Sequence, residues 1–161
     1  MVNINKDANI LVVDDDRELA DLAVEYLTTL GYKATPVYGG KEAFDLFSKG
    51  DFQVVITDLV MPDMNGMELL EAVKRIDKQV PVIVITGHGT VESAVEAIKK
   101  GAYDYLPKPI RMGEVEVIVK RALERQTLAK QLGLFRGLTL ALLISIPFWL
   151  ILGIILTLLF K

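Results

Sequence analysis

Acidic residues follow two apolar runs of the sequence, at the point where each run ends. The first run is followed by Asp14, Asp15 and Asp16, and the second run, at 54–57, is followed by Asp58. If both runs are neighbouring parallel strands, these carboxylates meet at one edge of a sheet, where they repel one another unless a cation lies among them. Carboxylate oxygens around a small, hard cation indicate Mg²⁺.

A hydroxyl and an ammonium follow two later runs in the same manner. The run at 82–85 ends in Thr86, and Lys108 follows the run at 103–106 after one proline. A carboxylate can attack phosphorus when cations neutralise the charge that builds on the phosphoryl oxygens. We therefore interpret Asp58 as the candidate nucleophile, with a metal ion and Lys108 supplying the positive charge.

Short β-branched runs alternate with helical patterns along the chain. Strands are predicted at 10–14, 33–37, 53–57, 82–86 and 103–106. Five strands with intervening helices predict an α/β fold with a parallel, doubly wound sheet and helices on both faces. Ligands of such sheets bind beyond the carboxyl ends of the strands, where all the polar features above are expected.

The segments between the strands show the apolar spacing of helices. The apolar positions are Leu19, Leu22, Ala23, Tyr26, Leu27 and Leu30 in the first helix, and Val91, Ala94, Val95 and Ile98 in the fourth. Each pattern predicts a helix that lays one face on the sheet. Asn65 and Glu68 predict a capped start for the third helix, and a fifth helix is expected from about Met112.

An acid pair, a lone Asp, a Thr and a Lys, each just past a strand and in this order, resemble the receiver domain of two-component response regulators. The resemblance runs from about Asn9 to Arg125 and includes the segment 61–66, Met-Pro-Asp-Met-Asn-Gly. It implies the strand order 2-1-3-4-5. It also implies a phosphoacceptor that receives its phosphoryl group from a sensor histidine kinase or a phosphotransfer protein, and a signalling switch more than an enzyme.

The resemblance implies a role for each site residue. Asp16 is expected to start a helix, and the peptide bond between Lys108 and Pro109 is expected to be cis. The expected roles are phosphoacceptor for Asp58; metal ligand for Asp14, Asp15, Asp58 and the main-chain carbonyl of Val60; phosphoryl binding for Thr86 and Lys108; switching for Thr86 and Tyr105; and tuning of the phosphoryl lifetime for Val60 and His88.

Length and composition limit the remaining possibilities. The chain has 161 residues, a net charge of −3 and no cysteine. Disulfides, thiolate metal sites and cysteine nucleophiles are therefore excluded. The charge provides no basic surface for nucleic acid, so no nucleic-acid partner is expected. The expected organisation is an N-terminal extension at 1–8, a receiver domain at 9–129, a juxtamembrane joint at 130–136 and a transmembrane helix at 137–160.

The C-terminal segment 137–160 contains no charged residue. As a helix it would extend about 36 Å, against a hydrocarbon core of about 30 Å. Basic residues outnumber acidic ones between 120 and 136, which predicts attachment to the inner (cytoplasmic) membrane with the receiver facing the cytoplasm. A soluble cytoplasmic chain, with this segment packed in an oligomer, is the alternative.

Small residues recur every four positions from Gly133 to Ser145, which predicts a homodimer through the tail. Pairing through the receiver is the alternative.

Two other functional classes fit part of the pattern. One is a receiver-like scaffold that binds proteins without phosphorylation, although the complete acid, Thr and Lys set argues against it. The other is a phosphohydrolase of the haloacid dehalogenase type, because residues 14–16 superficially supply its Asp-x-Asp. That family requires a Thr or Val soon afterwards, whereas Arg17 and Glu18 follow here.

Overall fold

The computed structural model describes residues 7–128, 143, 145, 155 and 156. The chain separates into two compact units, Met1–Gln126 and Thr127–Lys161. The predicted joint at 130–136 and nearly all of the predicted membrane helix at 137–160 lie outside the described residues. In the part of the chain that is described, no helix is both long enough and apolar enough to cross a bilayer. The membrane helix and the domain boundaries stay predictions.

A five-stranded sheet forms the centre of the first unit. All neighbouring strands are parallel, and their order is β2-β1-β3-β4-β5. The strands are β1 (Asn9–Val13), β2 (Lys33–Val37), β3 (Val54–Thr57), β4 (Val82–Thr86) and β5 (Asp104–Pro107). The α/β class, the parallel sheet and the predicted strand order are confirmed, and each strand boundary lies within one residue of its predicted position.

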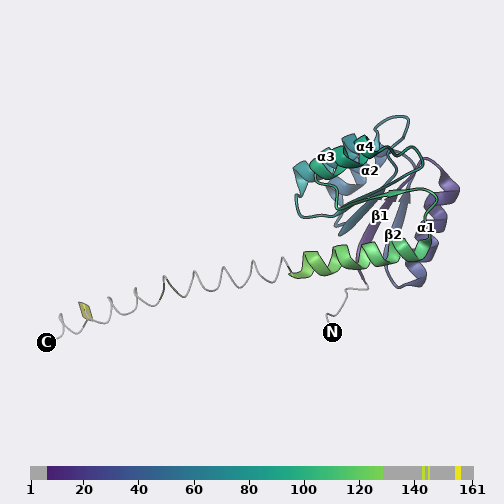
Figure 1. Ribbon diagram of the computed structural model, residues 1–161. Coiled ribbons are helices and arrows are strands. Elements are labelled where there is room, and N and C mark those ends of the chain that lie inside the picture. Colours follow the sequence, from purple (N-terminus) through teal and green to yellow (C-terminus); the bar gives the residue numbers. More distant parts are fainter. Residues whose placement is uncertain (1–6, 129–142, 144, 146–154, 157–161) are drawn as a thin grey trace. The chain divides into compact units, whose positions relative to one another are not determined.

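Helices cover both faces of the sheet (Figure 1). They are α1 (Arg17–Thr29), α2 (Gly40–Lys49), α3 (Gly66–Ile76) and α4 (Val91–Lys99), and residues 112–128 are also helical. Leu11 and Val13 of β1 join one core cluster with α2, α3 and α4, whereas Ile10 and Val12 join a second cluster with α1 and helix 112–128. This alternation follows from the pleat of a strand that is buried on both sides.

The predicted helix starts are present as hydrogen bonds. The Asp16 side chain accepts from the backbone N–H groups of Glu18 and Leu19, so it is the N-cap of α1, as expected. Asn65 and Glu68 form the predicted capping box of α3. The α1 cap follows the end of β1 by three residues, whereas the α3 cap closes the longer loop 58–65 after β3, so each cap fixes the far end of an acid-bearing loop.

The predicted orientation of α4 is wrong, although the helix itself is present. Val91, Val95 and Ile98 are 76%, 47% and 50% exposed, and Ala97 is the buried residue of this helix. The helix contacts the core through this small side chain. Its larger apolar side chains therefore lie to the side, where Val95 and Ile98 line a cavity of about 390 Å³ with Tyr105.

Helix α1 faces the sheet as predicted, but its first half does not fill the space there. Leu27 is fully buried, whereas Leu22 is 51% exposed. Leu19 and Leu22 line a cavity of about 490 Å³ together with sheet residues and Met112 of the last helix. Asp14, Asp58 and Lys108 lie on the lining of the same cavity.

Candidate functional site

The site is built where three strands end at one edge of the sheet. Asp14 directly follows β1, Asp58 directly follows β3, and Lys108 directly follows β5. Val13 and Thr57, the last residues of β1 and β3, are register partners, so the two acids leave the sheet side by side. The Asp58 N–H also donates to the Val13 carbonyl at 2.8 Å. Residues far apart in sequence thus meet as predicted.

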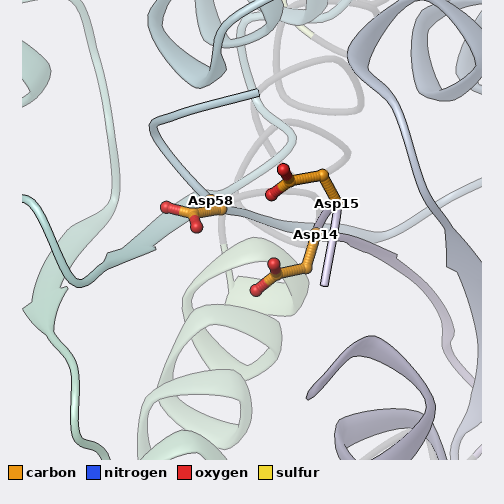
Figure 2. A group of neighbouring side chains, drawn as sticks. All are labelled: Asp14, Asp15 and Asp58. Carbon is orange, nitrogen blue, oxygen red and sulfur yellow. The ribbon is translucent and has the colours of Figure 1, made fainter. Parts of the chain in front are cut away.

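Three carboxylates lie close enough to share one cation. One oxygen each from Asp14, Asp15 and Asp58 falls within 4.8 Å of the others, and Figure 2 shows the three side chains as neighbours. Asp14 and Asp58 are buried, each 8% exposed, and Asp15 is exposed. A hard, all-oxygen donor set with one solvent-facing member suits Mg²⁺, which keeps several of its waters. The donor chemistry therefore fits the predicted metal.

Lys108 bridges the two buried acids. Its Nζ donates to Asp14 Oδ2 at 2.6 Å and to Asp58 Oδ2 at 3.0 Å. Burial alone would lower the pKa of Lys108, but its bonds to the two carboxylates outweigh burial and raise the pKa. Lys108 is therefore held as a cation beside the candidate phosphoacceptor.

The ionised form of Asp14 is disfavoured by its burial in this arrangement. Burial raises its pKa, and the hydrogen bond from Lys108 opposes this shift only in part. With Asp15 included, three acids face one ammonium, which leaves an excess of negative charge. A divalent cation at this position would relieve that excess.

Asp58 is oriented through both of its oxygens. Oδ1 accepts from the Leu59 N–H at 2.5 Å, with a longer contact of 3.4 Å from the Val60 N–H, while Oδ2 faces Lys108. Val60 is half exposed in the loop after Asp58. The structure thus places Val60 beside the acid, and the roles of its carbonyl and side chain stay predictions.

Thr86 and Lys108 are joined through the main chain. The Lys108 N–H donates to the Thr86 carbonyl at 2.8 Å, and the peptide bond between Lys108 and Pro109 is cis, as expected. Thr86 is fully buried at the end of β4, and its Oγ1 accepts from the His88 N–H at 3.2 Å. His88 itself is exposed. The hydroxyl is thereby brought to the same sheet edge as the acids.

Tyr105 has a partner that the sequence did not suggest. Its hydroxyl lies 2.8 Å from Ser93 Oγ on α4, and Ser93 also forms a capping box with Thr90. The bond joins β5 to the first turn of α4. A helix pattern identifies the capping pair, but it contains no signal that a strand residue shares that hydroxyl.

Asp63 is a second residue whose contacts were not predicted. Its carboxylate accepts from the backbone N–H groups of Gly40, Lys41 and Met64. These bonds, above all that from Met64, lower the pKa of Asp63. The one sequence signal is Gly39 before α2, which has no side chain to cap that helix.

Comparison with known families and proteins agrees with this geometry. The family model for the response regulator receiver domain matches residues 10–120. The chain is 36% identical over 120 residues to the DNA-binding transcriptional regulator NtrC of Azospirillum brasilense, covering 74% of this chain and 25% of that protein. It is 34% identical over 125 residues to the probable transcriptional regulator ycf29 of Porphyra purpurea, covering 76% and 60%. The chain thus spans less than two thirds of these relatives.

Solved structures show the same fold over most of the first unit. A response regulator receiver domain protein from Clostridium thermocellum superposes with a TM-score of 0.73 at 32% identity, covering 76% of this chain and 98% of that one. The signal receiver domain of a LuxO repressor protein from Vibrio parahaemolyticus gives 0.74 at 33% identity, covering 78% and 97%. Both are similar to this chain across nearly their whole length.

Proposed function

Because this chain belongs to the response regulator receiver domain family, we propose that it is the phosphoacceptor of a two-component or phosphorelay system and that Asp58 takes the phosphoryl group. The observation that carries the proposal is the position of Lys108, whose ammonium lies 3.0 Å from Asp58 inside a cluster of three acids. The Asp58 carboxylate supplies the nucleophile, and the Lys108 ammonium, with a cation bound by the acid cluster, would supply the positive charge for the incoming phosphoryl oxygens.

The proposed reaction is a transfer from a phosphohistidine on a histidine kinase or phosphotransfer protein. An Asp58 oxygen attacks phosphorus, the new O–P bond forms as the donor's N–P bond breaks, and the imidazole leaves with the bonding pair. Lys108 pairs with a phosphoryl oxygen, while the Leu59 N–H holds the carboxylate in position. When bound by Asp14, Asp15, Asp58 and the Val60 carbonyl, Mg²⁺ would neutralise phosphoryl charge.

In this proposal the protein is a switch, not a turnover enzyme. The Thr86 hydroxyl moves to the phosphoryl group, and Tyr105 turns inward and leaves Ser93. Val60 and His88, at the open side of the site, tune how fast water reaches the acyl phosphate. The expectation that the chain binds no nucleic acid rests on its composition and stays a prediction. NtrC is named as a DNA-binding protein, but the matched part is only 25% of its length, so its name does not decide the question for this chain.

Intact-mass measurement with a small phosphodonor and Mg²⁺ tests the phosphoacceptor. The full chain is expected to gain one phosphoryl group, and Asp58→Asn none. Asp51→Asn, which removes an exposed acid in the loop before β3, is the control and is expected to label normally. Labelling of Asp58→Asn would overturn the proposal. A wild-type chain that never labels would favour the scaffold, and phosphomonoester turnover that survives Asp58→Ala would favour the hydrolase.

We also propose that segment 137–160 tethers the receiver to the cytoplasmic face of the inner membrane, on the strength of its uncharged sequence and the basic residues before it. Two charges in the run, Leu143→Lys with Leu152→Lys, should each oppose insertion by about 3 kcal/mol near mid-depth. The wild-type chain is expected to stay with membranes after alkaline washing, and the variant to be released. Equal release of both chains would overturn the membrane-tether proposal and leave the phosphoacceptor proposal intact.

A further inference from the structure

The start of α2 is capped by an acid from a distant loop. Asp63 Oδ1 accepts from the Gly40 N–H at 3.2 Å and from the Met64 N–H at 2.8 Å, and Oδ2 accepts from the Lys41 N–H at 3.2 Å. Gly39, the N-cap, offers no side chain of its own. A helix leaves its first N–H groups unpaired and carries positive charge at that end, so a carboxylate placed there stabilises it on both counts.

Asp63 lies in the loop that begins at the phosphoacceptor. This loop runs from Asp58 to Gly66, the first residue of α3, and contains Val60. A bond from the Gly66 N–H to the Leu59 carbonyl at 2.9 Å ties the two ends of the loop together. A Cβ on Gly66 would lie 2.0 Å from the Asp58 carbonyl oxygen, so this closure leaves no spare room.

Inside the loop, Asp63 and Met64 contact the start of α2. A Cβ on Gly40 would lie 2.1 Å from the Met64 carbonyl oxygen, which means that the backbone of the helix start touches the backbone of the loop. The three bonds to Asp63 lie at this contact. Val60 therefore lies between two fixed points of the loop: Leu59, which is bonded to Gly66, and Asp63, which is bonded to the start of α2.

We propose that Asp63 is a positioning residue of the phosphoryl site, which fixes the loop carrying Val60 by capping α2 and so presents the Val60 carbonyl to a divalent cation. The inference rests on the proposed function, since it deepens the role of that loop. Asp63 touches neither the cation nor the phosphoryl group. Removal of the Asp63 carboxylate frees the loop from α2, and the cation then has to order the loop when it binds.

Three variants of the full chain separate this role from a general loss of stability. Asp63→Ala removes the cap, and Asp63→Asn keeps an oxygen that can accept from the helix start. Asp77→Ala removes a partly exposed acid at the other end of α3, whose carboxylate accepts from the Gln79 N–H. Calorimetry with Mg²⁺ alone is expected to show a dissociation constant raised about 3- to 10-fold for Asp63→Ala. Asp63→Asn and Asp77→Ala are expected to stay near the wild-type value.

Two further readouts distinguish positioning from instability. Without metal, amide hydrogen exchange at Val60 is expected to accelerate in Asp63→Ala and not in Asp77→Ala. With a small phosphodonor, labelling of Asp63→Ala should be slow at limiting Mg²⁺ and approach the wild-type rate when Mg²⁺ saturates. A residue that mattered only for folding would lower the rate at both concentrations.

An unchanged Mg²⁺ affinity together with unchanged exchange at Val60 in Asp63→Ala would overturn the inference. If that variant does not fold, Asp63→Ser, which leaves a weaker cap, takes its place with the same criteria. Failure of Asp58 to label would overturn the proposed function alone, because metal-free exchange at Val60 still reports whether Asp63 holds the loop.

Discussion

Lys108 Nζ and Asp14 Oδ2 lie 2.6 Å apart, which ties the loop after β5 to the end of β1 across 94 residues of sequence. The pair is mostly buried, with Asp14 at 12% and Lys108 at 21% side-chain exposure. Even with this partner the pKa of Asp14 is raised, chiefly by burial. The fold therefore keeps the ionised form of Asp14 at a cost to its own stability, as expected for a group retained for binding.

Replacing Asp14 by Asn is expected to stabilise the metal-free protein at pH 7. The substitution removes a buried charge, keeps the shape of the side chain and leaves Lys108 paired with Asp58. The gain should be on the order of 1 kcal/mol in the free energy of unfolding. Urea denaturation in the presence of a chelator measures it, and a loss of stability at pH 7 would show that the pair with Lys108 outweighs the burial of Asp14.

The same variant should show how this gain depends on pH. A raised folded pKa means that the folded wild-type protein takes up a proton more readily than the unfolded chain. Its stability therefore falls as pH rises from 3.8, the ordinary pKa of an Asp side chain, through the higher pKa of folded Asp14. The advantage of Asp14→Asn is therefore absent below that window and complete above it. Denaturation midpoints across this range provide the measurement, and a pH-independent difference would contradict the assignment to Asp14.

Mg²⁺ should stabilise the folded chain through Asp15 and not through its neighbour Asp16. At about 100 times the dissociation constant, a bound ion adds about 2.7 kcal/mol to the free energy of unfolding. Asp15→Asn removes an exposed ligand and should lose most of this gain. Asp16→Asn is the matched control, because Asn also caps a helix well and the cap of α1 is retained. Equal Mg²⁺ responses of the two variants would exclude Asp15 as a ligand.

The sheet and the acid site could be predicted because the relevant signals are local. Asp14, Asp58 and Lys108 each stand next to the strand that positions them, and parallel strands present their carboxyl ends at one edge. The pairing therefore follows once the strand order is known. Asp16 and Asn65 were likewise predictable as caps, since a cap and its helix are adjacent in sequence.

Contacts between separate loops could not be predicted in this way. Asp63 caps a helix 23 residues before it, and nothing periodic in the sequence connects the two segments. The prediction of the orientation of α4 was wrong for a related reason. A 3.6-residue period shows that Val91, Val95 and Ile98 share a face, but it does not show whether that face meets the sheet or lies beside Tyr105.

Removing the Ser93 hydroxyl should release Tyr105 from the half-buried position that it has in this structure. The bond between the two hydroxyls, at 2.8 Å, contributes about 1 kcal/mol to this position. Its loss should move the unphosphorylated protein roughly fivefold toward the inward state. Fluorine NMR of fluorotyrosine-labelled Ser93→Ala should show the Tyr105 resonance shifted toward its phosphorylated position. Ser48→Ala, whose hydroxyl bonds within α2, is the control. An unshifted resonance in Ser93→Ala would show that the bond to Ser93 does not hold Tyr105 in place.

Two glycine substitutions should have opposite effects on stability. An alanine Cβ at Gly66 would lie 2.0 Å from the Asp58 carbonyl oxygen, a backbone atom that cannot move without displacing Asp58. Gly66→Ala should therefore cost about 1–3 kcal/mol or more and slow phosphodonor labelling. At Gly113 nothing lies within 4 Å of the added Cβ, and the residue is helical, so Gly113→Ala should be neutral or stabilise by up to about 1 kcal/mol with normal labelling. Urea denaturation measures the stability of both variants, and intact-mass measurement follows their labelling. A Gly66→Ala protein with wild-type stability would show that the loop after Asp58 can shift to accommodate the added Cβ.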